Sequence, residues 1–198
     1  MPKAVDPIQK RSEFVAASWD VIAAEGLKAA TLRRVAAEAG CTTGALTHYY
    51  TDRRSLLVDA LRAAHYQAGA RMMDAAKRIS SHQARLKAVL LEALPLDEPR
   101  VREWRVWLAF WAESMNDAEL AQENTRRYAE WRRLLEDVVR PVVRNRSEAK
   151  REVAHLVALI DGLGLRLARH ASSDQVLEDE QRECAATLVR HLTRFEAA

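Results

Sequence analysis

The sequence contains few of the residues that interrupt helices. Of its 198 residues only six are Gly and five are Pro, whereas the helix-favouring residues Ala, Leu, Arg and Glu are abundant. No stretch alternates apolar and polar residues in the manner of a half-buried strand. We therefore expect an all-α fold, and the apolar periodicity divides the chain into about nine helices.

Long apolar runs and paired cysteines are also missing. No window of about eighteen residues is uncharged and apolar enough to cross a membrane, and the first residues, MPKAVDPIQKR, contain no apolar signal segment. We therefore expect a cytoplasmic protein with no membrane partner. Cys41 and Cys184 lie far apart and outside any CxxC pair, which argues against a disulfide framework and a metal site.

Motifs typical of enzymes are absent as well. Gly162 and Gly164 lie inside a predicted helix with no preceding strand, which excludes a phosphate-binding loop. His48 has no neighbour at metal-ligand spacing. The sequence therefore predicts no catalytic residue, no metal and no cofactor, and an enzyme with an unrecognised site is the least favoured alternative.

Charge gives only a weak indication of a partner. The formal net charge is +3, and residues 1–54 hold eight Lys or Arg against six Asp or Glu. This surplus is too small to establish nucleic-acid binding, so the placement of individual residues must decide.

Two short helices are predicted between residues 31 and 50. Thr31 and Thr42 are suited to cap their N-termini, and Gly40 is suited to end the first helix in a left-handed conformation. Apolar residues of the first helix recur at intervals of three and four and form one face: Leu32, Val35, Ala36 and Ala39. Two capped helices joined by a tight turn are a helix-turn-helix candidate.

A longer helix before this pair is predicted to be its scaffold. Asp6 and Pro7 favour the start of that helix and Gly26 favours its end. The basic residues near its start have two interpretations, a solvated chain end or an arm that touches phosphate; they are Lys3, Lys10 and Arg11.

The second short helix turns small, hydrogen-bonding side chains outward, as entry into a DNA major groove requires. Asp52 then caps a long helix whose first residues, Arg53 and Arg54, oppose the helix dipole and are candidates for phosphate contacts. Pairing with Asp52 or another acid is the alternative. Tyr50 is predicted to be core. The predicted DNA-contacting residues are Arg33, Thr42, Thr43, Gly44, Thr47, His48, Tyr49 and Arg53.

The remaining residues are predicted to form helices. The long helix extends to about residue 79, and later patterns cover about 82–94, 102–115, 118–140, 147–170 and 175–195. These helices are separated by Pro95 to Pro99, by the capping pair Asn116-Asp117, by Pro141, and by Ser172-Ser173-Asp174.

Aromatic residues are concentrated in two of these helices. Such stripes are usually core, but a cationic ligand also seeks aromatic faces and a carboxylate, so both interpretations stay open. Asp161 is the better candidate carboxylate and Glu113 the other; a salt bridge from Asp161 to Arg166 or Arg132 is the alternative. The predicted effector-binding residues are Trp104, Trp107, Trp111, Met115, Tyr128, Trp131 and Asp161.

The last two predicted helices each carry one apolar stripe. Two such pairs, one from each of two chains, would close a four-helix bundle. Gly164 costs about 1 kcal/mol in a helix interior relative to Ala, a cost that close helix approach or room for a ligand would offset. The predicted dimerisation residues are Val157, Ile160, Gly164, Leu167, Cys184, Leu188 and Leu192.

The N-terminal motif resembles the TetR family of transcriptional repressors over about residues 8–57. The residues that carry this resemblance are the Thr31 cap, Val35-Ala36, Gly40, Thr42, Gly44, His48-Tyr49-Tyr50 and Leu56-Leu57. Tyr50 replaces the usual Phe, Thr47 replaces a frequent Tyr, and Arg53 replaces the usual Lys.

The C-terminal part is similar to the choline-responsive repressors of the BetI type. The segments that carry this similarity are Trp107 to Ala112, Tyr128 with Trp131 to Arg133, and Leu159 to Leu163. Gly164 stands where those repressors often have a bulky aromatic residue.

The resemblance implies a homodimer with two domains in each chain. Residues 1–52 would form the helix-turn-helix domain that binds a palindromic operator in double-stranded DNA. Residues 53–198 would form the helical domain for dimerisation and for a small-molecule effector, such as a quaternary or polyamine cation. The alternative is a helical small-molecule binding protein with a vestigial helix-turn-helix.

Overall fold

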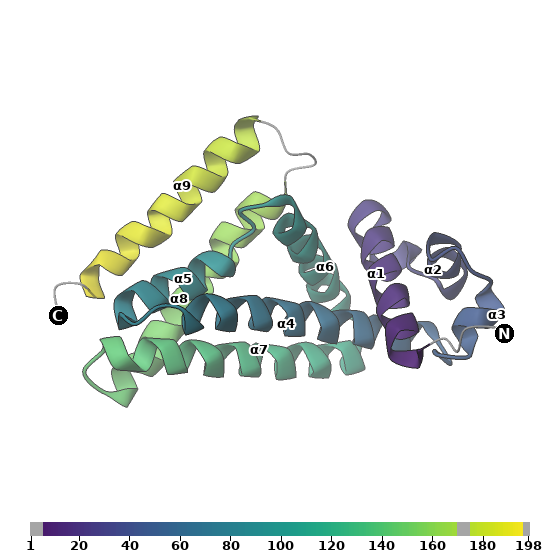
Figure 1. Ribbon diagram of the computed structural model, residues 1–198, viewed down its shortest axis with the longest axis horizontal. Helices are drawn as coiled ribbons and strands as arrows, with labels where there is room; N and C mark the ends of the chain where they lie inside the picture. The colour runs from purple at the N-terminus through teal and green to yellow at the C-terminus, as the bar shows by residue number, and fades with distance from the viewer. Residues whose placement is uncertain (1–5, 170–174, 196–198) are drawn as a thin grey trace. The chain divides into compact units, whose positions relative to one another are not determined.

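The computed structural model describes residues 6–169 and 175–195, and all secondary structure in these ranges is helical (Figure 1). The all-α prediction is therefore confirmed for this part of the chain. Lys3 and the predicted break at Ser172 to Asp174 lie outside the described residues.

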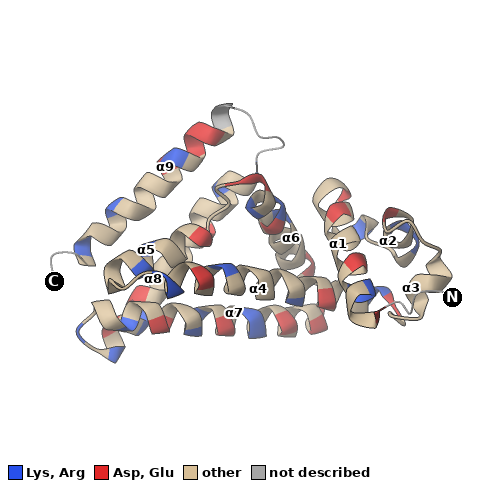
Figure 2. Cartoon of the chain, viewed as in Figure 1, with Lys and Arg blue, Asp and Glu red and all other residues tan. Residues whose placement is uncertain are grey.

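The helix boundaries lie within a few residues of those predicted. In chain order the elements are α1 (Pro7–Glu25), η1 (Leu27–Ala29), α2 (Leu32–Glu38), α3 (Thr43–Thr47), α4 (Arg53–Lys77), α5 (His82–Glu92), α6 (Glu98–Ser114), α7 (Ala118–Val139), η2 (Arg140–Val142), α8 (Arg146–Ala168), α9 (Gln175–Leu192) and η3 (Thr193–Phe195). Acidic and basic residues alternate along α7 (Figure 2).

The predicted capping residues begin the N-terminal helices. The backbone N–H of Arg34 donates to the Thr31 hydroxyl at 3.1 Å, and that of Ala45 donates to the Thr42 hydroxyl at 3.2 Å. Gly40 has a φ of 65°, in the left-handed region that favours glycine. Local hydrogen bonds of this kind stabilise a helix end by about 1 kcal/mol each, and here they define two very short helices.

The chain divides into two compact units, and the boundary differs from the one predicted between residues 52 and 53. The first unit contains residues 1–64 and 105–124, and the second contains residues 65–104 and 125–198. The reason is packing, because Leu56, Leu57 and Leu61 of α4 belong to the same buried cluster as Phe14 of α1 and Phe110 of α6.

In the second unit α9 packs against α5 and α8. Leu167, Leu177 and Cys184 form a small apolar cluster there. A row of ion pairs borders it, in which Arg166 contacts Glu183 at 2.7 Å and Glu180 at 3.4 Å, and Arg169 contacts Glu180 at 3.2 Å. The apolar contact and the charges together hold the last two helices side by side.

Gly164 of α8 provides space for the indole ring of Trp104 from α6. A Cβ atom at this glycine would overlap the Trp104 ring, whose N–H donates to the carbonyl of Ala93 at 2.9 Å. Trp104 is only 7% exposed. The close approach expected to offset the cost of this glycine is therefore a contact with a tryptophan of the same chain.

None of the helices in the described ranges has the length and apolar character needed to span a membrane. The same residues contain no cluster of three or more His, Cys, Asp or Glu side chains arranged to bind a metal.

Candidate DNA-binding and effector sites

The helix-turn-helix is anchored by large side chains beneath it. Leu46 of α3 is fully buried, and the ring of Phe14 from α1 packs edge-on against Tyr49 and Tyr50 at centroid distances of 5.4 and 6.4 Å. Because α3 faces inward through Leu46, Gly44 and Thr47 lie exposed on its other side.

The predicted DNA-contacting residues of this segment lie on that outward side. Four of them are exposed and two are half-buried: Thr42, Gly44, Thr47 and His48, and Thr43 and Tyr49 respectively. The Thr47 hydroxyl donates to the carbonyl of Gly44 at 2.9 Å, so its oxygen remains available to accept a bond. The face is small, polar and uncharged, which suits contact with base edges.

Tyr50 lies in the core, as predicted. It is 1% exposed, and the guanidinium of Arg11 lies 5.0 Å from the centre of its ring. Burial raises the pKa of the Tyr50 hydroxyl to about 12, so the side chain stays neutral. Tyr50 therefore supports the module from within, while Tyr49 lies at its surface.

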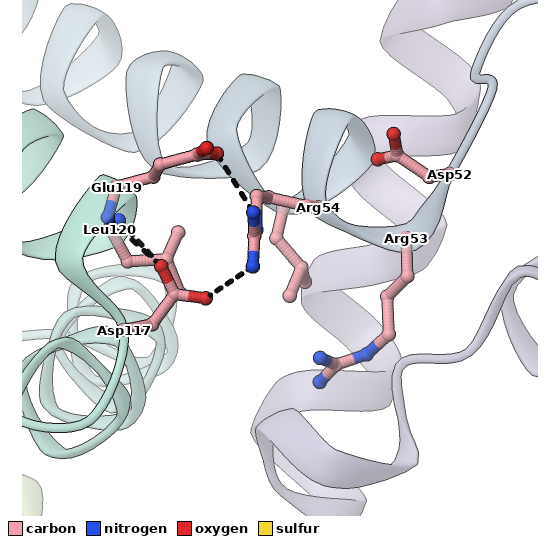
Figure 3. Close-up of a pocket in the computed structure, with 7 residues that line it drawn as sticks. Asp52, Arg53, Arg54, Asp117, Glu119 and Leu120 are labelled. Carbon is pink, nitrogen blue, oxygen red and sulfur yellow. Dashed lines mark hydrogen bonds and ion pairs between the residues drawn. The ribbon is translucent and has the colours of Figure 1, made fainter.

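Arg53 and Arg54 both bind groups of the first unit, and their side chains point in different directions (Figure 3). The Arg53 guanidinium donates to the backbone carbonyls of Leu27, which begins η1, and of Ala30, which follows it. Arg54 pairs with Asp117 at 3.1 Å and with Glu119 at 3.0 Å, both at the start of α7. These residues border a surface hollow of about 560 Å³. Arg54 therefore pairs with an acid, as the alternative prediction stated, but its partners are Asp117 and Glu119 and not Asp52.

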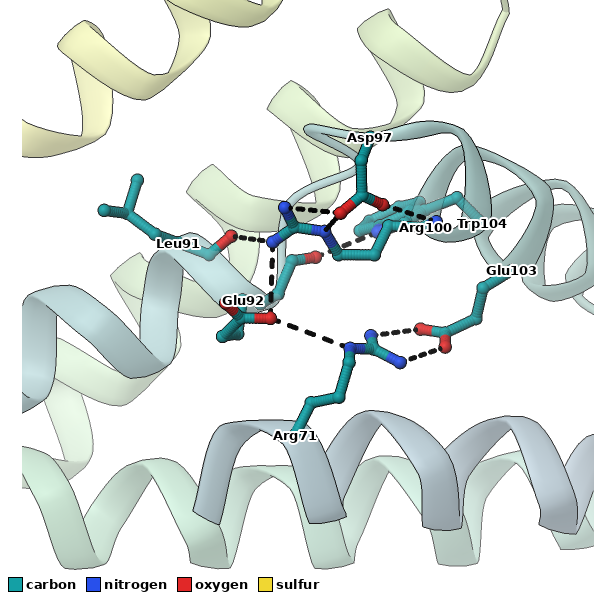
Figure 4. A network of polar contacts seen from close by, with 8 residues as sticks. Arg71, Leu91, Glu92, Asp97, Arg100, Glu103 and Trp104 are labelled. Carbon is teal, nitrogen blue, oxygen red and sulfur yellow. Dashed lines mark hydrogen bonds and ion pairs between the residues drawn. The ribbon is translucent and has the colours of Figure 1, made fainter. Parts of the chain in front are cut away.

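A charged network that the sequence does not reveal lies in the second unit (Figure 4). Arg71 of α4 makes two hydrogen bonds, of 2.7 and 3.0 Å, to the carboxylate of Glu103 on α6. Glu103 is 5% exposed, and this burial raises the pKa of its carboxyl while the Arg71 charge opposes the change. Glu92 joins the network through Arg71 and Arg100, at 3.7 and 3.4 Å.

Asp161, the predicted carboxylate of the effector site, is bound to Tyr128. The Tyr128 hydroxyl donates to Asp161 Oδ2 at 2.6 Å, and the first alternative partner, Arg166, instead pairs with Glu180 and Glu183. Burial raises the pKa of Asp161. Burial and the Asp161 carboxylate also raise the pKa of Tyr128. The acid of α8 and the phenol of α7 thus form one hydrogen-bonded pair.

The other predicted effector-binding residues are distributed over both units. Tyr128 and Trp131 lie with Asp161 in the second unit, and Trp107 packs against the core of the first. Met115 is 83% exposed, so it lies at the surface of the first unit. Trp104 is fixed against Gly164 and Ala93, which makes it part of the core. Trp111 is half-buried in the first unit.

The residues predicted for dimerisation form the internal side of α8 and α9. All seven are buried in a single chain: Val157, Ile160, Gly164, Leu167, Cys184, Leu188 and Leu192. Leu167 and Cys184 pack in one cluster between α8 and α9, and Gly164 packs against Trp104 of α6. These buried residues have little surface to offer a second copy, so the predicted face needs correction. The periodicity identified the apolar face of each helix, but the helices of the same chain cover it.

A capped helix-turn-helix on an α-helical body defines a DNA-binding regulator. Comparison with protein families agrees: residues 14–60 match the model of bacterial regulatory proteins of the tetR family, and residues 82–194 match the model of the C-terminal part of BetI-type transcriptional repressors. The chain belongs to the TetR family. It is a ligand-responsive transcriptional regulator and not an enzyme, as predicted.

Individual relatives share most of the chain. The regulator PksA of Bacillus subtilis (strain 168) is 30% identical over 184 residues, covering 92% of this chain and 88% of PksA. The regulator BetI of Paraburkholderia phytofirmans is 33% identical over 171 residues, covering 84% of this chain and 85% of BetI.

Solved structures show the same fold. A transcriptional regulator from Rhodococcus sp. Rha1 superposes with a TM-score of 0.76 at 28% identity, covering 91% of this chain and 96% of that one. A putative transcriptional regulator from Saccharomonospora viridis, solved in complex with choline, superposes with a TM-score of 0.78 at 23% identity, covering 93% and 97%.

Proposed function

We propose that this protein is a homodimeric repressor that acts in the cytoplasm, binds a palindromic operator and leaves it when a small-molecule effector binds. The observation that carries this proposal is the outward side of α3 and its C-cap, where Gly44, Thr47 and His48 are exposed and no acidic residue occurs in the helix. A recognition helix uses such side chains to read base edges in the major groove.

The exposed face of α8 supports the dimer. On α8 exposed residues recur at intervals of three and four, and most are small: Ala154, Ala158, Gly162 and Leu165. A Cβ atom at Gly162 would meet nothing within 4 Å, so a second chain has room to approach closely. For a two-fold dimer to bind one palindrome, its two recognition helices must lie about 34–36 Å apart, the spacing of successive major grooves.

Selection of bound sequences from a random duplex library tests this function. We expect the purified protein to select a palindrome, and we expect Thr47→Glu to weaken binding to it by about a hundredfold or more, because a carboxylate on the recognition helix repels phosphates and cannot replace the hydroxyl contacts. Affinity is measured by fluorescence anisotropy, with the mass of the complex giving the number of protomers.

Thr193→Glu is the matched control for this test. Thr193 is exposed, and its hydroxyl donates to the carbonyl three residues earlier at 2.8 Å, as that of Thr47 does at 2.9 Å. We expect no change in DNA affinity for it. If no palindrome is selected, or if both variants bind equally, the alternative of a small-molecule binding protein with a vestigial helix-turn-helix is correct.

For the effector we propose a quaternary or polyamine cation held by Asp161. The half-buried Asp161 carboxyl accepts a hydrogen bond from the Tyr128 hydroxyl. This carboxyl would gain a favourable partner when a cation arrives, and the Tyr128 ring would offer the cation an aromatic face. The choline complex of the structurally similar regulator from Saccharomonospora viridis is consistent with this class of ligand.

A thermal-shift titration with choline tests the effector proposal. We expect choline to raise the unfolding temperature of the protein and Asp161→Asn to abolish that rise, whereas Glu113→Gln, which alters the other candidate carboxylate, retains it. Because burial raises the pKa of Asp161, the rise should diminish as the pH falls through that pKa and the carboxylate becomes protonated. If only neutral apolar compounds stabilise the protein, or if Glu113→Gln and not Asp161→Asn removes the effect, the assignment is wrong.

A further inference from the structure

We propose that Lys28 and Arg33 make the phosphate contacts of each protomer, and that Arg53 positions them without contacting DNA itself. This inference rests on the proposed function, because it names the groups with which the helix-turn-helix meets its DNA partner. It assigns a role to Lys28, which sequence patterns did not single out, and it replaces the phosphate contact predicted for Arg53.

Most basic side chains of the N-terminal part already make ion pairs or hydrogen bonds within the protein. Residues 6–64 contain eight Lys or Arg, and six of them have partners within the first unit. The pairs are Lys10 with Glu13 at 2.6 Å, Arg11 with Asp59 at 3.2 Å, Arg34 with Glu25 at 2.7 Å and Glu38 at 2.8 Å, Arg54 with Asp117 at 3.1 Å, and Arg62 with Glu123 at 2.9 Å. Arg53 is bound to carbonyls.

The two remaining cations lie together in sequence and are exposed. Lys28 is in η1 and Arg33 is in the first turn of α2, on either side of the capping residue Thr31. Neither makes an ion pair or a side-chain hydrogen bond with any residue in the described ranges. A cation without a protein partner approaches a phosphate without first breaking an ion pair, so these two have the smallest cost of contact.

Arg53 fixes the short segment that carries Lys28. Its Nε donates to the carbonyl of Ala30 at 3.0 Å, and its other bond goes to the carbonyl of Leu27, so the two acceptors flank Lys28 in sequence. A guanidinium fork is suited to hold two carbonyls at once. Since its donors point at the backbone of η1, Arg53 acts on DNA binding by holding Lys28 in place.

The proposal predicts an unusually weak dependence of DNA affinity on salt. Two contacts per protomer give about four per dimer, and each contact contributes about −0.9 to the slope of log affinity against log salt concentration. We therefore expect a slope of about −4. If the six occupied cations also reached phosphates, the slope would be several-fold steeper.

Salt titrations by fluorescence anisotropy test this, using a labelled mixed-sequence duplex and, separately, the duplex obtained by selection. We expect Lys28→Ala and Arg33→Ala each to reduce the slope by about two per dimer. Arg53→Gln should lower the affinity at every salt concentration and leave the slope unchanged, with circular dichroism verifying that the variant is folded.

The charge-neutral double variant Lys10→Gln/Glu13→Gln is the matched control, because it removes a paired cation together with its partner. We expect an unchanged slope. A wild-type slope of about −8 or steeper, an unaltered slope for Lys28→Ala, or a reduced slope for Arg53→Gln or for the control overturns the inference. If the protein bound the selected duplex no better than the mixed-sequence duplex, the proposed function would be contradicted. The salt slope on the mixed-sequence duplex would still test the phosphate contact of Lys28.

Discussion

Gly164→Ala is expected to destabilise the protein by about 1–3 kcal/mol, the usual cost of overpacking a core. The added Cβ overlaps the ring of Trp104, and that ring is buried and tied to the carbonyl of Ala93. It therefore cannot swing aside without losing a hydrogen bond and its packing. Urea denaturation of the purified protein measures the change.

Gly69→Ala is the control for this substitution. Gly69 also lies inside a helix, α4, but a Cβ atom there would meet nothing within 4 Å. Alanine favours helices over glycine by about 1 kcal/mol, so we expect this variant to be at least as stable as the wild type. In addition, Trp104→Phe should reduce the cost of Gly164→Ala when the two are combined, because neighbouring sites couple. Equal stability of the two glycine variants would show that the overlap does not exist.

Arg71→Met is expected to cost about 3–5 kcal/mol, because it leaves the buried carboxylate of Glu103 without its cation. Replacing both partners, as in Arg71→Met/Glu103→Leu, should recover most of the loss, since a pair of apolar residues needs no compensation. Arg166→Met, which removes a partly exposed cation of the α8–α9 pair, should cost about 1 kcal/mol or less.

The loss in Arg71→Met should depend on pH. Burial raises the pKa of Glu103 even with Arg71 present, and removal of that cation raises it further. A carboxyl whose pKa is higher in the folded state than in the unfolded state favours folding at low pH and loses that contribution as the pH rises through the folded pKa. The difference in unfolding free energy between Arg71→Met and the wild type should therefore shrink as the pH is lowered from 7 towards 5. A difference that is small at pH 7, or that grows on acidification, would contradict this account of the network.

The features that the sequence predicted well are local. Thr31, Thr42 and Asp52 each bind a backbone N–H three residues onward, and Gly40 adopts its positive φ within a single turn. Such features depend on neighbours in the chain, so a short stretch of sequence contains all that is needed. The same holds for Tyr50, whose position at the end of a helix-turn-helix predicts burial.

The features that the sequence missed depend on distant partners. Trp104 and Gly164 are sixty residues apart, and nothing in either segment indicates that one fills the space left by the other. Arg53 is bound by carbonyls of η1, and backbone acceptors have no signature in sequence. The dimerisation residues were misassigned for a related reason, because periodicity shows that residues share a face but not which chain covers it.

The contact between Trp104 and Gly164 has a consequence for how this protein changes during evolution. A larger residue at position 164 is acceptable only after position 104 has become smaller, because the first change alone produces a steric overlap, whereas a smaller residue at 104 leaves only a cavity. The two substitutions that lead to a bulky side chain on α8 must therefore occur in a fixed order, first at position 104 and then at position 164. This path passes through a less tightly packed intermediate, and within that intermediate the space vacated by the indole becomes available to a ligand.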